Sequence, residues 1–62
     1  MHALVVEDET LLNKELKEQL LEEQFTVDAV LNFSEAEELL LGEIYDLVLL
    51  DLSLPGGDGL DL

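Results

Sequence analysis

The sequence predicts an α/β fold in which three parallel strands alternate with two helices. Two uninterrupted apolar runs, residues 3–6 and 47–50, have the length and apolar content of strands that are buried on both faces. Between these runs, the spacing of the apolar residues changes to that of amphipathic helices. Strands that alternate with helices through short connections form right-handed βαβ units, so we expect a parallel sheet.

The first βα unit begins with residues 3–6, a strand that ends in three consecutive acids. His2 precedes this strand and is predicted to be an ordinary strand-entry residue, because nothing near it in the sequence supplies a second metal ligand. An amphipathic helix of about 13 residues begins at Thr10. Its apolar stripe consists of leucines at a spacing of four, Leu12, Leu16 and Leu20, widened by Leu11 and Leu21. Its other face is polar and carries Asn13, Lys14, Glu15, Lys17, Glu18, Gln19, Glu22 and Glu23.

The second βα unit begins with residues 25–30, in which apolar and polar side chains alternate. Alternation indicates a strand with one wetter side, as expected at the edge of a sheet. Ser34 and Glu37 then match the S-x-x-E capping box, in which the two side chains satisfy free amides at the start of a helix. The apolar stripe of this helix is predicted to be Ala36, Leu39 and Leu40, and Gly42 is the expected C-terminal cap.

The third predicted strand, residues 47–50, delivers the carboxylate of Asp51 to its end. The chain then breaks into a turn rich in proline and glycine, namely Pro55, Gly56, Gly57 and Gly59. In a parallel sheet, ligands bind just beyond the carboxyl ends of the strands. Asp51 is therefore the acid that is best placed for chemistry.

The charge and composition of the chain exclude several classes of function. Sixteen acids and two lysines give its 62 residues a formal net charge of −14, so direct binding of DNA or RNA by this segment is not expected. The absence of cysteine excludes disulfides and thiolate metal sites. A hydrophobic content of 48% is too high for a disordered chain. No apolar stretch approaches the ~20 residues of a membrane span, and the N-terminus does not resemble a signal peptide, so we expect a cytoplasmic protein with no membrane partner.

The acids at the ends of the first and third strands form a candidate site. If those strands are neighbours, Glu7, Asp8 and Asp51 converge on one edge of the sheet, where a cation would relieve their mutual repulsion. Hard oxygen ligands, without cysteine or a second histidine, favour Mg²⁺ over zinc or copper. An aspartate beside such an ion can act as a nucleophile toward a phosphoryl group and form an aspartyl phosphate.

Over essentially its whole length the chain resembles the first half of a response-regulator receiver domain, in particular of the DNA-binding two-component regulators. The resemblance rests on the acidic pair after the first strand, on the leucine-striped helix, on Ser34-Glu35-Ala36, and above all on residues 46–59, an apolar strand followed by D-x-x-L-P-x-x-D-G. It implies that Asp51 is the phosphoacceptor, phosphorylated from a histidine kinase. It also implies that Mg²⁺ is held by Glu7, Asp8, Asp51 and the backbone carbonyl of Ser53.

The resemblance further implies half of a flavodoxin-like doubly wound parallel sheet, βαβαβ with strand order 2-1-3. Residues 1–62 would then be a truncated receiver domain, with its first three strands, two helices and the start of a third helix at residues 60–62. In this order the third strand lies at an edge, so we expect it to pair with a second copy of the chain or with the missing C-terminal half. The chain is not expected to be an enzyme, beyond the self-catalysed phosphotransfer of the full-length family.

Two alternatives remain open from the sequence. The first is a truncated or engineered half-receiver that assembles into a homodimer, with a sheet completed by dimerisation and no phosphotransfer activity. The second is a simple Mg²⁺ or Ca²⁺ binder.

Overall fold

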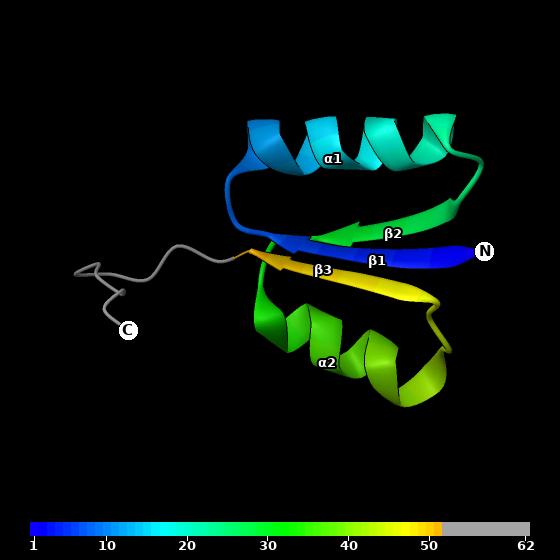
Figure 1. Cartoon of the computed structure of the whole chain (residues 1–62). Coiled ribbons are helices and arrows are strands. Elements are labelled where there is room, and N and C mark those ends of the chain that lie inside the picture. Colours follow the sequence, from blue (N-terminus) through cyan, green and yellow to red (C-terminus); the bar gives the residue numbers. More distant parts are fainter. Residues whose placement is uncertain (52–62) are drawn as a thin grey trace, which may run out of the picture.

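A computed structural model, which describes residues 1–51, shows the predicted alternation of strands and helices (Figure 1). The elements are β1 (His2–Glu7), α1 (Thr10–Glu22), β2 (Thr26–Val30), α2 (Phe33–Gly42) and β3 (Leu47–Asp51). All three strands are parallel and their order is β2-β1-β3, which confirms the predicted fold class and strand order. The predicted third helix, the Pro/Gly turn and Ser53 lie outside the described residues.

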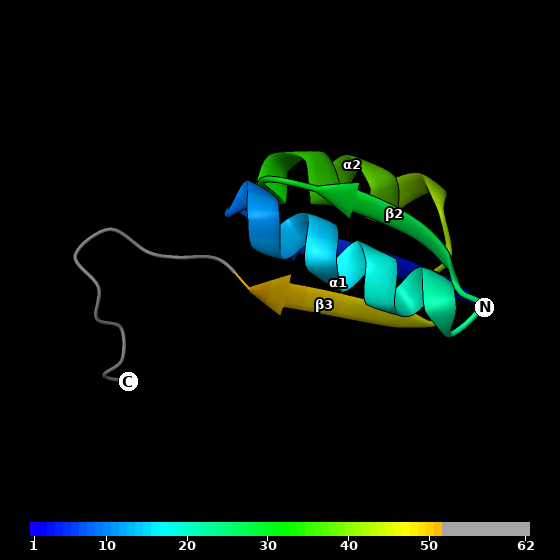
Figure 2. The same ribbon diagram turned by 90° about the horizontal axis from the view of Figure 1, so that it is seen from above.

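The sheet is the middle layer of the molecule, with α1 on one face and α2 on the other (Figures 1 and 2). β1 is the central strand, and its apolar run is almost completely buried. On the face that α2 covers, Leu4 and Val6 pack with Ala36, and Val30, Leu39 and Tyr45 complete this cluster. The short apolar run at residues 3–6 is therefore the core of the fold, as its continuous hydrophobicity predicted.

The boundaries of α1 agree with the prediction, but its buried face does not. Asn13, which was assigned to the polar face, is only 8% exposed, whereas Leu11 and Leu21 are exposed. Asn13 stands three residues before Leu16 and seven before Leu20, so the turn of the helix brings it onto their side. The sheet-facing stripe therefore contains fewer leucines than predicted, and it includes the side-chain amide of Asn13.

α1 ends in a Schellman motif that the sequence did not predict. Gln24 adopts the left-handed conformation, with φ of 72°, and donates its amide to the Leu21 carbonyl at 3.0 Å. The amide of Phe25 donates to the Leu20 carbonyl at 3.1 Å. Because Phe25 is used in this motif, β2 begins at Thr26 rather than at Phe25.

Both predicted caps of α2 are wrong. The helix begins at Phe33, and its N-cap is Asn32, whose side chain accepts the Glu35 amide at 2.9 Å. Asparagine and serine are about equally good N-caps, so sequence alone could not choose between Asn32 and Ser34. At the other end, Gly42 is the last helical residue and Glu43, with extended backbone, follows as the C-cap. Leu40, predicted to be buried, is exposed.

β3 is the least covered strand. Val48 and Leu50 lie in register with Leu4 and Val6, and so on the face that α2 covers, yet they are 43% and 59% exposed. Both helices pack against β1 and β2 rather than against β3. The prediction of a strand buried on both faces is therefore wrong for β3, whereas its place at the edge of the sheet is confirmed.

Candidate functional site

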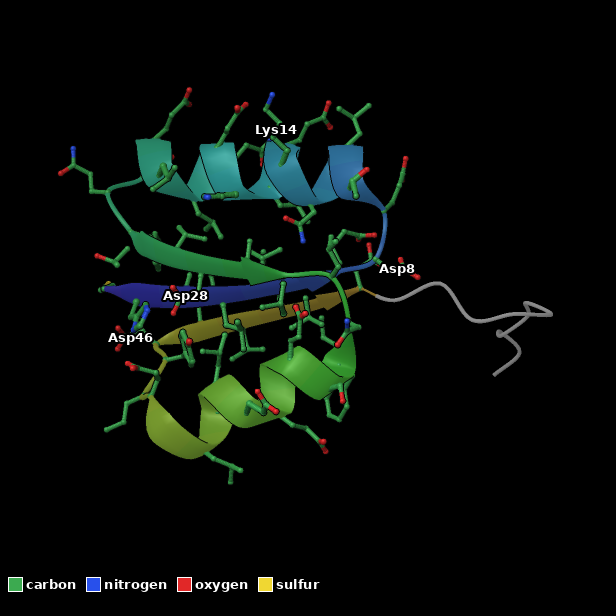
Figure 3. The ribbon with its side chains drawn as sticks, turned by 180° about the vertical axis from the view of Figure 1, so that it is seen from behind. Asp8, Lys14, Asp28 and Asp46 are labelled. Carbon is green, nitrogen blue, oxygen red and sulfur yellow. The ribbon has the colours of Figure 1, made fainter. Side chains whose placement is uncertain are left out.

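The candidate site lies at the carboxyl edge of the sheet, where β1 and β3 end. Parallel pairing places Glu7 directly in register with Asp51. Asp8 follows Glu7 in the connection to α1, at the same end of the molecule (Figure 3). The structure thus brings together the two strand-end acids that the sequence predicted to converge, while the fourth predicted ligand, Ser53, lies outside the described residues.

Glu7 is an unusual carboxylate, because only 3% of it is exposed. Its Oε2 accepts a hydrogen bond from the Glu9 amide at 2.9 Å, which bends the chain back toward the strand end. Its Oε1 is buried and has no hydrogen-bond partner among residues 1–51. Asp51, in contrast, is exposed to solvent. The pair therefore combines one buried and one accessible carboxylate.

These surroundings raise the pKa of Glu7. The largest single influence is the Glu9 amide, which lowers this pKa, but the other influences together outweigh it. Burial disfavours the ionised form of Glu7, as does the neighbouring charge of Asp51. The closeness of the Asp51 and Asp8 carboxylates acts in the same direction, because two carboxyl groups can share a hydrogen bond only when one of them is protonated.

A buried carboxylate oxygen without a donor, beside a second carboxylate, fits a cation. The available donors are all oxygens, which suits Mg²⁺. Within residues 1–51, no group of three or more His, Cys, Asp or Glu side chains is gathered closely enough to hold a metal by itself. The described acids would therefore supply part of a coordination shell, which agrees with the usual habit of Mg²⁺ to retain several waters.

Asn13 supports this edge of the sheet and was missed in the sequence. Its side-chain nitrogen donates to the carbonyl of Glu7 at 3.1 Å and to that of Val30 at 2.8 Å. The signal that could have identified it is its helical spacing to Leu16 and Leu20, which places an amide on the sheet-facing side of α1.

A second polar cluster, at the amino edge of the sheet, was also missed. The Asp28 carboxylate accepts the Tyr45 hydroxyl at 2.7 Å and lies 3.0 Å from Nε2 of His2. The His2 and Tyr45 rings are 4.3 Å apart, and Asp46 accepts the His2 amide at 2.7 Å. His2 is therefore not an ordinary strand-entry residue. No local sequence signal connects these residues, because they come from β1, β2 and the connection that precedes β3.

The two edges of the sheet differ in their acid–base properties. The hydroxyl of Tyr45 is the main cause of a lowered pKa at Asp28, with His2 adding to it. Burial, followed by the hydrogen bond to Asp28, raises the pKa of Tyr45 to about 12. The amino-edge carboxylate is thus stabilised in its ionised form, whereas Glu7 at the other edge is not.

Comparison with known proteins places these features in a family. Residues 3–62 match the family model described as the response regulator receiver domain. The chain is 44% identical over 62 residues to the virulence transcriptional regulatory protein PhoP of Salmonella typhimurium, and 47% identical to the two-component response regulator PhoP of Pseudomonas aeruginosa. Each alignment covers 100% of this chain and 28% of the relative, so the chain spans little more than a quarter of these proteins. No solved structure matches the chain.

Proposed function

Because the chain belongs to the response regulator receiver domain family, we propose that Asp51 is the phosphoacceptor of a cytoplasmic two-component phosphorelay. The observation that carries this proposal is the pairing at the carboxyl edge, where the exposed Asp51 lies in register with the buried Glu7. A phosphoryl donor can reach Asp51, and Glu7 offers an unpartnered oxygen to a cation beside it.

The donor in this proposal is the phosphohistidine of a histidine kinase. A carboxylate oxygen of Asp51 attacks the phosphorus, the new P–O bond forms, and the P–N bond to the imidazole breaks. The imidazole nitrogen leaves with the electron pair of that bond and takes up a proton, and an acyl phosphate remains on Asp51. Each chain accepts one phosphoryl group, so we propose a stoichiometric acceptor rather than an enzyme with turnover.

Glu7, Asp8 and Asp51, together with the carbonyl of Ser53, would hold Mg²⁺ at this edge. When bound, the ion supplies positive charge that offsets the negative charge of the phosphoryl oxygens. The chain itself contributes the orientation. The amide of Glu9 fixes one oxygen of Glu7, and the other has no hydrogen-bond partner within residues 1–51.

The test is phosphorylation of the 62-residue chain by a small phosphoryl donor such as phosphoramidate, followed by mass spectrometry. We expect a Mg²⁺-dependent adduct on Asp51 that is absent from Asp51→Asn. Asp46→Asn is the matched control, because it makes the same change at the other edge and retains an oxygen that can accept the His2 amide. An adduct that persists in Asp51→Asn, or none on the original chain, would contradict the assignment.

The exposed edge of β3 supports a second property, self-association. Val48 and Leu50 expose apolar surface, and residues 47–50 carry no charge, proline or glycine, the features that normally protect an edge. We propose that two copies pair along β3 around a two-fold axis. The net charge of −14 on each chain opposes this pairing, so the association should strengthen with salt.

Sedimentation equilibrium at two salt concentrations tests the pairing. We expect a dimer that is favoured at high salt and abolished by Val48→Lys combined with Leu50→Lys. A monomer at both salt concentrations would contradict the pairing.

A further inference from the structure

Asn13 is a buried amide in a helix face that otherwise carries leucine. It is 8% exposed and stands on the sheet-facing side of α1 together with Leu16 and Leu20. A buried amide costs stability unless it is hydrogen-bonded, and a leucine at this position would fit the apolar stripe without that requirement. The polar residue breaks the helical pattern at the place where α1 meets the candidate site.

The hydrogen bonds of Asn13 join the carboxyl ends of two strands. Both acceptors, the carbonyls of Glu7 and Val30, can bond only to the amide nitrogen, so they fix the orientation of the side chain. The paired residues of β1 and β2 end at Val6 and Val30, and the Asn13 amide provides donors directly beyond that point. Asn13 therefore holds the end of β1 against β2 where regular pairing stops.

Glu7 is consequently held on both its backbone and its side chain. Asn13 fixes the carbonyl of Glu7, and the amide of Glu9 fixes Oε2. The amide of Asn13 in turn donates to the Glu9 carbonyl at 2.8 Å, so a single turn of α1 controls both contacts. The oxygen that remains, Oε1, is buried and has no hydrogen-bond partner among the described residues, and Asp51 is the neighbouring carboxylate.

We propose that Asn13 is a positioning residue of the cation site, which holds the end of β1 so that Oε1 of Glu7 is presented to a divalent ion next to Asp51. This inference rests on the metal site of the proposed function. Groups that orient metal ligands from outside the first coordination shell typically change metal affinity by about 10–100-fold when they are removed.

The experiment compares the 62-residue chain with two variants. Asn13→Leu keeps the size of the side chain and removes its donor. Gln19→Leu makes a comparable change at an exposed position of the same helix and is the control. Two quantities are measured by NMR: the affinity for Mg²⁺, and the hydrogen-exchange protection of the Glu9 amide, which reports whether Glu7 is held in place.

We expect Asn13→Leu to weaken Mg²⁺ binding by about tenfold or more, and to accelerate exchange of the Glu9 amide, while its far-UV circular dichroism stays close to that of Gln19→Leu. Asn13→Gln, which keeps the amide, should recover part of the affinity. A merely structural role would instead lower the thermal midpoint and leave the affinity of the folded fraction unchanged, and that result would overturn the inference.

The remaining outcomes are also decisive. If the original chain binds no Mg²⁺, the proposed metal site fails, but exchange of the Glu9 amide still tests whether Asn13 positions Glu7. Loss of protection in Asn13→Leu alone would support that role, and unchanged protection would overturn it. If Asn13→Leu does not fold, the Mg²⁺ affinity and the exchange of the Glu9 amide are measured on Asn13→Ala instead, with the same expected outcomes. Unfolding of both would show a structural role only and would overturn the proposal.

Discussion

The two ends of β1 carry polar clusters of opposite character, with Asp28 and Asp46 toward its amino end and Asp8 toward its carboxyl end (Figure 3). At the amino end, the Asp28 carboxylate accepts from Tyr45 and lies against His2, and its pKa is lowered. At the carboxyl end, one oxygen of Glu7 has no hydrogen-bond partner in the part of the chain that the structure describes, and the pKa of this residue is raised. The same sheet thus contains a satisfied carboxylate and an unsatisfied one. The satisfied cluster stabilises the fold, whereas the unsatisfied one gives up stability and keeps an oxygen available to a ligand.

The largest effect is expected from removing the Glu7 carboxylate, and it concerns the binding of Mg²⁺. Glu7→Gln should weaken Mg²⁺ binding by more than about tenfold, because an amide oxygen is a poorer ligand for a hard cation than a carboxylate. In the absence of metal, the same variant should have a higher thermal midpoint, since its repulsion with Asp51 is removed. Calorimetric titration and thermal melting with and without Mg²⁺ measure both effects. A lower thermal midpoint without metal would show that repulsion between Glu7 and Asp51 does not destabilise the fold.

Breaking the satisfied cluster should have the opposite effect. Asp28→Ala leaves the Tyr45 hydroxyl and the His2 ring without their acceptor. We expect a loss of about 1–2 kcal/mol in the free energy of unfolding, at the low end for bonds to a charged group because Asp28 is partly solvated. Its affinity for Mg²⁺ should be unchanged. Denaturant unfolding measures the loss, and a comparable loss of Mg²⁺ affinity would refute the separation of the two ends.

The two ends should also respond to pH with opposite signs. The lowered pKa of Asp28 contributes stability that is present above its unfolded value and is lost as the pH falls through its folded value. The raised pKa of Glu7 makes the folded state bind the proton more tightly, so stability falls as the pH rises above the unfolded value of Glu7. The free energy of unfolding, measured across the acidic range, should therefore depend less on pH at the acid end for Asp28→Asn. For Glu7→Gln it should depend less on pH toward neutrality. Identical profiles for the two variants would contradict the assignment.

The smallest predicted effect involves no charge. Gln24 occupies a left-handed conformation that favours glycine, in the turn that leads into β2 at the amino edge. Gln24→Gly should stabilise the chain by about 0.5–1 kcal/mol, because relief of the strained backbone exceeds the greater entropy of the unfolded chain. This gain should be the same at every pH. A pH-dependent gain would mean that the turn is coupled to the Asp28 cluster.

Sequence reasoning succeeded where a signal is local. The run that ends at Asp51 and the run that ends at Glu7 are each continuous in the sequence, and parallel pairing alone brings their ends together. It failed where the choice depends on partners that are distant in the chain. The helical spacing of Asn13 places it on the sheet-facing side of α1, but only its two strand-end acceptors explain why an amide is tolerated there. The cap at Asn32 rather than Ser34 is a choice between residues of similar capping strength.

In residues 1–51, neither α1 nor α2 is both long and apolar enough to cross a lipid bilayer.

The central place of β1 has a consequence for synthesis of the chain. β1 precedes both of its neighbours in the sequence, and its apolar run becomes covered only when β2, and then β3, have been added on its two sides. During translation the most deeply buried of the three strands therefore emerges before the two strands that enclose it. Parallel pairing across intervening helices closes slowly because it brings together distant parts of the chain. The acids that follow β1 directly, beginning with Glu7, would keep this strand from aggregating while it waits for its partners.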